Sequence, residues 1–217
     1  NVAAHISNLK WLNAILGDGI HTNGQLQVEA GIKGTLSQPV FSGTVSGREL
    51  SVALLEQGIN LQQGSLTARF HQADLKIDRL HFVTPHEIPP DRRLFKDLKP
   101  DDTPGSVTIT GDIGLISKNS RLDFTIDQLP VTHETDYWMV ISGAGEARLE
   151  DDRLNIKGAI SADAGLLRQP PEGRPALSGD IVFVNAPKQT GQSFPLHLDM
   201  NFNLGERFYL RASGLEG

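Results

Sequence analysis

The feature of this sequence that most constrains its fold is an alternation of apolar and polar residues with a period of two. It is most regular near the end of the chain, where residues 194–204 read FPLHLDMNFNL. Successive side chains of a β-strand point to opposite faces of a sheet, so this pattern puts large apolar residues on one face and small polar residues on the other. The segment predicts a long strand that is apolar on one side only.

The same alternation returns along much of the chain. It is present in residues 25–36, 106–116, 121–129 and 153–162. Glycines interrupt these and similar runs, and a glycine inside a strand often marks a bulge, a bend or a close approach of two backbones. We therefore expect an all-β chain built on an elongated, curved sheet. The glycines concerned are Gly34, Gly43, Gly111, Gly158 and Gly179.

Helical periodicity is confined to the start of the chain. In residues 6–16, ISNLKWLNAIL, the apolar residues recur near the helical period, which favours one short N-terminal helix; a strand that ends in a turn around Trp11 fits the same residues. Residues 84–105, with five prolines, and residues 168–175, RQPPEGRP, are predicted to be irregular loops. Because strand patterns of one type resume on both sides of each loop, we expect a single domain over residues 1–217.

Composition argues against several classes of function. The net charge of −6 is opposite in sign to the lysine-rich and arginine-rich surfaces that bind nucleic acid. The sequence has no cysteine, which removes disulfides and zinc-thiolate sites. It has no run of about 18 apolar residues that would span a bilayer and no leader at its start, so we expect a soluble piece.

No catalytic or metal-binding motif stands out. The candidates are the group of His81, His86 and Glu87, the carboxylates of residues 101–102 and 150–152, and the glycine-rich segment 142–147. The histidine group lacks the ligand spacing of zinc sites, and the carboxylates lie beside turn-forming residues, where solvated acids are common. The glycine-rich segment continues into a strand-like run, which is the wrong context for an anion-binding loop. We expect no enzymatic activity, no metal and no cofactor.

The apolar faces of these strands require a cover. A second sheet would close them into a β-sandwich, but the bulky aromatic residues that fill such cores make up only 6% of the chain. The other solution is a groove filled by an acyl chain, which gains ~0.8 kcal/mol for each methylene removed from water. Alternation alone leaves both solutions open. The residues predicted to line a groove are Leu26, Val28, Ile32, Leu36, Val107, Ile109, Ile113, Leu122, Phe124, Ile156, Ile160, Leu196, Leu198, Met200 and Phe202.

Several segments resemble the TamB family, the large AsmA-related proteins that bridge the periplasm of Gram-negative bacteria. The stretch GIKGTLSQPVFSGTVS is similar to a recurrent G-T-L-x-x-P-x-x-x-G pattern of that family, and ERFYLRASGLEG is similar to its final pattern. NLKWLNAIL, DGIHTNGQLQVEAGI and EQGINLQQGSLTARF resemble further family segments, and all the pieces follow the family's order. The matching residues named here are Gly34, Thr35, Leu36, Pro39, Gly43, Phe208, Leu210, Gly214 and Leu215.

The resemblance implies a fold and a cellular role. The fold is a β-taco, a long sheet folded along its length around an apolar groove, in which Pro39 marks a corner between neighbouring strands. The full-length protein would be anchored in the inner membrane, reach a TamA/BamA-type barrel in the outer membrane, and take part in phospholipid transport and outer-membrane biogenesis. This chain would be a soluble, periplasmic piece from the C-terminal region of such a protein.

Different functions fit these patterns. One is a lipid conduit in which the apolar face shields phospholipid acyl chains. Another is a scaffold or chaperone that binds outer-membrane protein clients by adding a strand to the edge of its sheet. A third, a closed carbohydrate-binding or hydrolytic sandwich, needs an aromatic platform, for which Trp11 and Trp138 are the only tryptophans.

Overall fold

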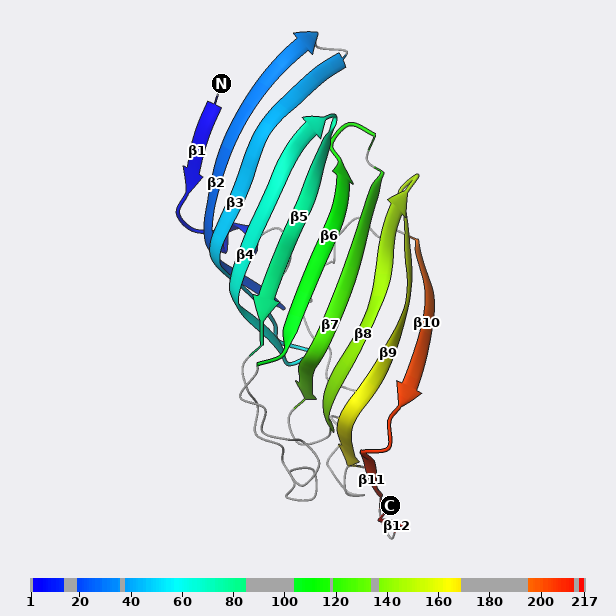
Figure 1. The fold of residues 1–217 in the computed structure, drawn as a ribbon. Helices are drawn as coiled ribbons and strands as arrows, with labels where there is room; N and C mark the ends of the chain where they lie inside the picture. The colour runs from blue at the N-terminus through cyan, green and yellow to red at the C-terminus, as the bar shows by residue number, and fades with distance from the viewer. Residues whose placement is uncertain are drawn as a thin grey trace, which may run out of the picture.

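The computed structural model describes residues 2–13, 19–35, 38–84, 104–117, 119–133, 137–168, 195–212 and 215–216. Within these residues the chain forms twelve strands of one sheet and a single 3-10 turn, η1 (Figure 1). In chain order the elements are β1 (Val2–Ile6), η1 (Lys10–Leu12), β2 (Ile20–Thr35), β3 (Gln38–Leu54), β4 (Ile59–Gln72), β5 (Asp74–Val83), β6 (Ser106–Gly114), β7 (Ser120–His133), β8 (Tyr137–Glu150), β9 (Arg153–Arg168), β10 (Leu196–Leu204), β11 (Phe208–Ala212) and β12 (Leu215–Glu216).

The order of the strands in the sheet follows their order in the chain. Strands β1 to β9 form an antiparallel meander in which each strand pairs with the next. At the far end, β10 and β11 both run parallel to β9 and pair with successive parts of its length, β10 along residues 154–162 and β11 along residues 165–168. An all-β, curved sheet is therefore confirmed.

The pairing register joins the apolar residues of separate strands into continuous rows. Directly opposed residues lie on the same face of a sheet, so a row can be followed from strand to strand. One row, here called the central row, runs from β2 to β10 through Val28, Val45, Ala68, Ile77, Gly111, Leu122, Ala147, Ile156 and Leu198. The next row, here called the second row, runs through Leu26, Gly47, Leu66, Leu80, Ile109, Phe124, Gly145, Gly158 and Met200.

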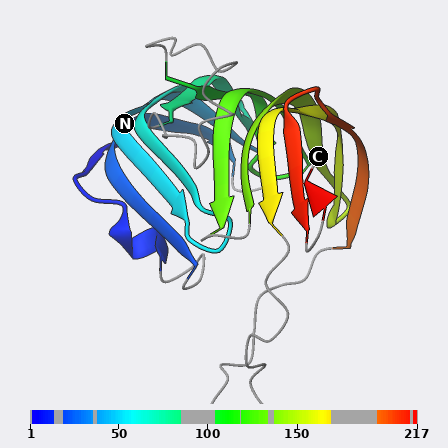
Figure 2. The ribbon, with the colours of Figure 1, turned by 90° about the horizontal axis from the view of Figure 1, so that it is seen from below.

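The sheet curls around the face that carries these rows. Seen from below the strands, it forms an arch (Figure 2). Strands β4 and β7 contact each other although β5 and β6 lie between them in the sheet. The pairing register shifts in β3, β4, β5, β7 and β9, and such bulges bend a strand and increase its twist. The face that carries the two rows is therefore the concave face of the arch.

The segment around Pro39 is a corner between two strands, as the sequence indicates. Gly34 pairs with Pro39 at the end of the β2–β3 hairpin, where β3 has just begun. Farther along β3, Gly43 has a φ of 126°, and a Cβ placed there would lie 1.9 Å from the carbonyl oxygen of Glu29. Glycine is thus required at position 43 because the two backbones approach closely, while the pairing between Ala30 and Gly43 stays regular.

Buried residues form three clusters on the two faces of the sheet. Two are on the concave face, one around Val45, Ala68 and Ile77 and one of Leu9, Leu50 and Phe82. The third comprises Trp138, Val140, Ala164 and Leu166. In β8 these residues have the opposite parity to the glycines of the rows, so this cluster lies on the convex face.

The N-terminal prediction is tested only in part. Residues 2–6 form a strand and Lys10–Leu12 form a 3-10 turn followed by the helical residue Asn13, so the described part of this segment fits a strand and a turn, and residues 14–16 lie outside the described residues. Ile6 pairs with Leu26 of β2, which places the apolar residues of this segment against a sheet rather than along a helix face. Residues 85–103 and 169–175 of the predicted loops lie outside the described residues, as does Gly179.

Candidate functional site

The concave face carries the residues that the sequence predicts as a groove lining. The register puts every described member of that set on this one face, from Leu26 in β2 to Phe202 in β10. Leu36 lies outside the described residues. A pattern read strand by strand therefore becomes one apolar surface, because each pairing brings the apolar parity of one strand opposite that of the next.

This surface is closed over the N-terminal strands. Val45, Ala68 and Ile77 are 7%, 0% and 7% exposed, and partly buried side chains from β2, β6 and β7 pack against them. Val107, one of the predicted lining residues, is also buried. Because the sheet curls, apolar side chains of different strands pack against one another here, as in an ordinary hydrophobic core. We call the concave face over β3 to β6 the closed part.

The same surface is open at the C-terminal edge. Leu196, Leu198 and Phe202 of β10 are 60%, 60% and 56% exposed although they continue the apolar rows. At the opposite margin, Ile32 is also exposed, on the β2–β3 hairpin that projects beyond its neighbours (Figure 1). We call the concave face over β8 to β10 the open part, because β10 is exposed there while most facing residues of β8 and β9 are half-buried. Contiguous exposed apolar surface of this kind marks a site of interaction.

The floor of the open part consists mainly of backbone and small side chains. Gly145 of β8 and Gly158 of β9 are directly opposed, and Gly143 and Ala147 lie on either side along β8. A Cβ on Gly145 would lie 2.5 Å from the ring of Phe124, so the ring occupies the space above this glycine. These small residues lie between larger apolar side chains of the same face, such as Phe124, Ile156 and Phe202.

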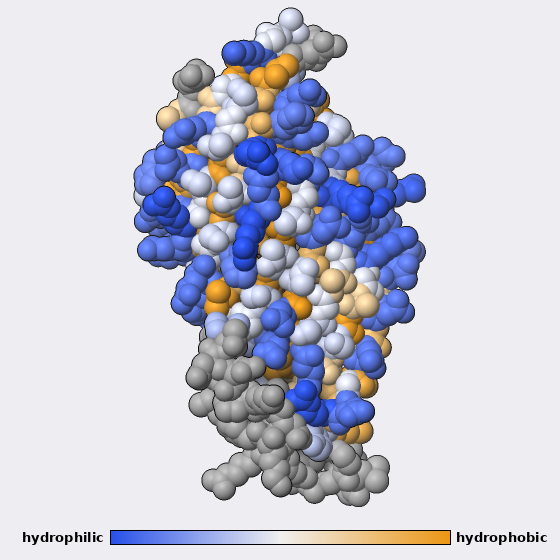
Figure 3. All heavy atoms as spheres, viewed as in Figure 1, coloured by the Kyte–Doolittle hydropathy of each residue, from blue (hydrophilic) through white to orange (hydrophobic). Residues whose placement is uncertain are grey.

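Outside the buried cluster around Trp138, the convex face is polar, and several of its charges pair with one another. Figure 3 shows hydrophilic side chains over most of the surface, with hydrophobic atoms in small patches between them. Arg69 binds Asp78 through two hydrogen bonds of 2.8 and 2.7 Å, which hold the pKa of Asp78 below its ordinary value. Glu146 contacts Arg148 and Arg121, and hydrogen bonding from Arg148 is the main cause of its lowered pKa. This face is suited to contact with water.

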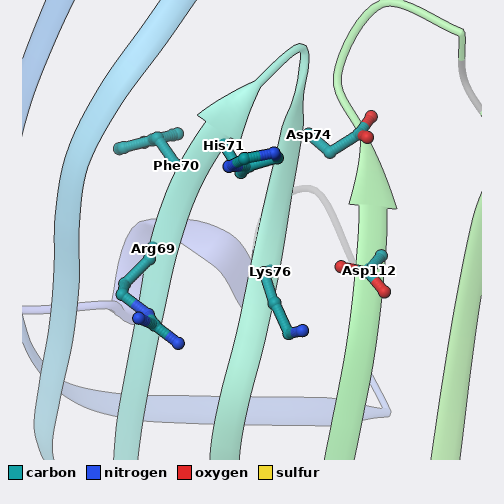
Figure 4. Close-up of a pocket in the computed structure, with 6 residues that line it drawn as sticks. All are labelled: Arg69, Phe70, His71, Asp74, Lys76 and Asp112. Atoms are coloured by element: carbon teal, nitrogen blue, oxygen red, sulfur yellow. The ribbon is translucent and has the colours of Figure 1, made fainter.

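A pocket of about 430 Å³ lies on the convex face beside the β4–β5 hairpin (Figure 4). Its polar lining residues mix both signs of charge, and Phe70 points away from them. Within the described residues, no group of three potential metal ligands comes together, here or elsewhere. The pocket is therefore a gap between solvated side chains. Its lining residues are Arg69, Phe70, His71, Asp74, Lys76 and Asp112.

The other residues considered for chemistry are dispersed. His81 contacts the hydroxyl of Thr108 at 2.9 Å, whereas His86, Glu87 and residues 101–102 lie outside the described residues. Residues 150–152 form the β8–β9 turn, and the glycine-rich segment 142–147 is part of β8.

The tryptophans form no platform, because Trp11 is 52% exposed in η1 and Trp138 is buried on the convex face. The polar contact between Asn13 and Thr22 has no signal in the sequence from which it could have been predicted.

The comparison with known families decides the assignment. Residues 95–217, more than half of the chain, match the family model described as the TamB C-terminal domain. The chain belongs to the TamB family. No curated protein and no solved structure matches it. The match includes the final motif, residues 206–217, and confirms that part of the resemblance; the other similar segments lie before residue 95, outside the matched range.

Membership of the TamB family carries a general role. TamB-family proteins belong to the periplasm and cell envelope and take part in outer-membrane biogenesis or in lipid or protein transport, in association with TamA-type partners of the outer membrane. No helix in the described part of this chain is long and apolar enough to cross a membrane. A specific function proposed for this chain has to account for its concave apolar face.

Proposed function

We propose that this TamB-family chain carries phospholipid between the inner and outer membranes, with the acyl chains lying on its concave apolar face. The observation that carries the proposal is the exposure of Leu198 and Phe202 on a face whose rows are elsewhere buried or half-buried. An acyl chain of about fifteen methylenes gains roughly 12 kcal/mol on leaving water, and the same contact covers the exposed side chains. The headgroup stays at the rim, in contact with water.

The proposed role extends to the rest of the protein. The full-length protein is anchored in the inner membrane and meets a TamA/BamA-type barrel at the outer membrane, as the family resemblance implies. Movement of lipid along an apolar face breaks no covalent bond, so the chain acts without catalysis and needs no cofactor. Residues such as Ile109, Phe124 and Met200 serve as a lining.

Neighbouring residues of β10 provide a matched test. Met200 lies on the concave face and Asn201, the next residue, on the convex face. We expect phospholipid to co-purify with the wild type and with Asn201→Arg and to be lost in Met200→Arg. Only the arginine at position 200 places a charge on the concave apolar face, where the acyl chains would lie. Native mass spectrometry with lipid extraction measures this. Equal lipid in both variants would contradict the proposal.

A second candidate function rests on the edge of the sheet. Within the described residues, β10 pairs with β9 alone, so its other edge has unpaired backbone groups that can accept a strand from an outer-membrane protein client. Neighbouring residues direct their N–H groups to opposite edges, so either Asp199→Pro or Met200→Pro removes an outward donor. Client binding that survives in both variants argues against this scaffold role.

A further inference from the structure

The N-terminal segment occupies part of the concave face. Ile6, Leu9 and Leu12 turn their side chains onto the closed part, and Leu9, only 6% exposed, clusters there with Leu50 and Phe82. Figure 2 shows this segment, in blue, at one limb of the arch. We call residues 6–13 the N-terminal cover.

The N-terminal cover lies on the same rows as the proposed acyl path. Leu26, Leu66 and Leu80 pack against the cluster of Leu9, and these three residues belong to the second row. Along the sheet this row continues through Ile109 and Phe124 to Met200 in the open part. An acyl chain that moves along the row from the open part toward β3 therefore meets the side chains of the cover.

Few polar contacts hold the cover in place. The backbone N–H and the hydroxyl of Thr22 both lie 2.7 Å from Oδ1 of Asn13, and the same hydroxyl lies 3.0 Å from the carbonyl oxygen of Leu9. Beyond Ile6, the cover has one 3-10 turn with no side-chain cap at its N-terminus. Compared with the long ladders of β2 and β3, this attachment is short, and its apolar contacts are of the kind that an acyl chain also makes.

We infer that the N-terminal cover is a displaceable segment that regulates how far lipid enters the groove. In the closed state, Leu9 and Leu12 occupy the place of an acyl chain; in the open state they leave and the acyl chain takes their position on Leu50 and Phe82. The inference rests on the proposed function, because it concerns regulation of the same apolar face. The contact between Asn13 and Thr22 stabilises the closed state, and we call this contact the latch.

A reversible cross-link tests the latch within one protein. The chain has no cysteine, so the double variant Asn13→Cys with Thr22→Cys carries a single pair of thiols at the contact. Its oxidised form locks the cover, and its reduced form leaves it free. After incubation with vesicles of phosphatidylethanolamine and phosphatidylglycerol, we expect the reduced form to retain at least twice as much phospholipid per chain, measured by native mass spectrometry. Equal retention in both forms would overturn the inference.

A second pair of variants serves if the disulfide does not form. Leu9→Ser removes a buried anchor of the cover, and Trp11→Ser changes a side chain of the same turn that is 52% exposed. We expect Leu9→Ser to raise lipid retention about two-fold and Trp11→Ser to leave it unchanged; no difference between them overturns the inference. If the wild type retains lipid and Met200→Arg loses it, the proposed function stands and only the inference about the N-terminal cover fails. A wild type that retains none overturns both.

Discussion

Gly43 and Gly111 stand where two backbones approach too closely for any side chain. Both have φ values in the left-handed region, 126° and 138°. A Cβ on Gly111 would lie 2.1 Å from the carbonyl oxygen of Arg121, as one on Gly43 would collide with Glu29. These contacts are to backbone atoms, which cannot move without distorting the sheet.

Replacing Gly43 with alanine is therefore expected to destabilise the fold. We expect Gly43→Ala to lower the free energy of unfolding by about 1–3 kcal/mol, through backbone strain and the displaced Glu29 carbonyl. Gly19→Ala is the control, because a Cβ there lies 3.9 Å from the flexible side chain of Glu56. Urea unfolding compares the two variants. Equal stability of both would mean that the close approach is not a constraint.

His81 makes stability depend on pH. Burial, and then the positive charge of Arg79, lower its pKa from about 6.5, while its ring contacts Thr108. The unfolded chain therefore binds the proton more readily than the folded chain, so stability is present above pH about 6.5 and falls as the pH drops toward the lowered pKa.

We expect His81→Gln to flatten this dependence between pH 7.5 and 5.5. Chemical unfolding followed across this range measures the effect. A wild-type profile that stays unchanged in His81→Gln would show that another group titrates.

At the scale of the strands, bulges bend the sheet at places that the sequence does not mark. Positive φ values at bulges fall on Glu49, Gln63 and Gln128, none of which is a glycine. The glycines within the strands correctly predicted a curved sheet, but two of them, Gly43 and Gly111, lie in regularly paired segments and not at bulges. A long polar residue in the left-handed region has no local sequence signal, because neighbouring strands, rather than its own preference, hold it there.

Three strands are joined at one such bend. The backbone N–H of Gln128 in β7 donates to the hydroxyl of Ser142 in β8 at 2.9 Å, and that hydroxyl donates to the carboxylate of Asp163 in β9. Asp163 is the extra residue of the β9 bulge. The serine therefore connects the irregular positions of two neighbouring strands.

We expect Ser142→Ala to cost about 1–2 kcal/mol of stability, because it leaves the N–H of Gln128 and the carboxylate of Asp163 without this partner. Ser42→Ala is the matched control, since the hydroxyl of Ser42 makes a longer contact of 3.4 Å with the carbonyl oxygen of Gly31. Thermal and urea unfolding compare the two. A cost in Ser142→Ala no larger than in Ser42→Ala would contradict the role assigned to this bend.

At the scale of the whole molecule, periodicity predicted which face is apolar but not what covers it. Parity placed Val107 and Leu198 in one set, yet Val107 is buried and Leu198 is 60% exposed. Such differences depend on the curl of the sheet, which rests on contacts between strands that are distant in the sheet, such as β4 and β7. Periodicity also gave no sign of the buried cluster around Trp138 on the convex face.

Strand β10 allows a direct test of whether lipid acyl chains lie on the concave face of the open part. Leu196, Leu198 and Phe202 point to that face, and His197, Asp199 and Asn201 point away from it. A photo-crosslinking amino acid at each position in turn, followed by mass spectrometry of lipid adducts, reads out contact residue by residue. We expect adducts at the first three positions and none at the other three. Adducts without this alternation, or none at any position, would contradict the proposed function.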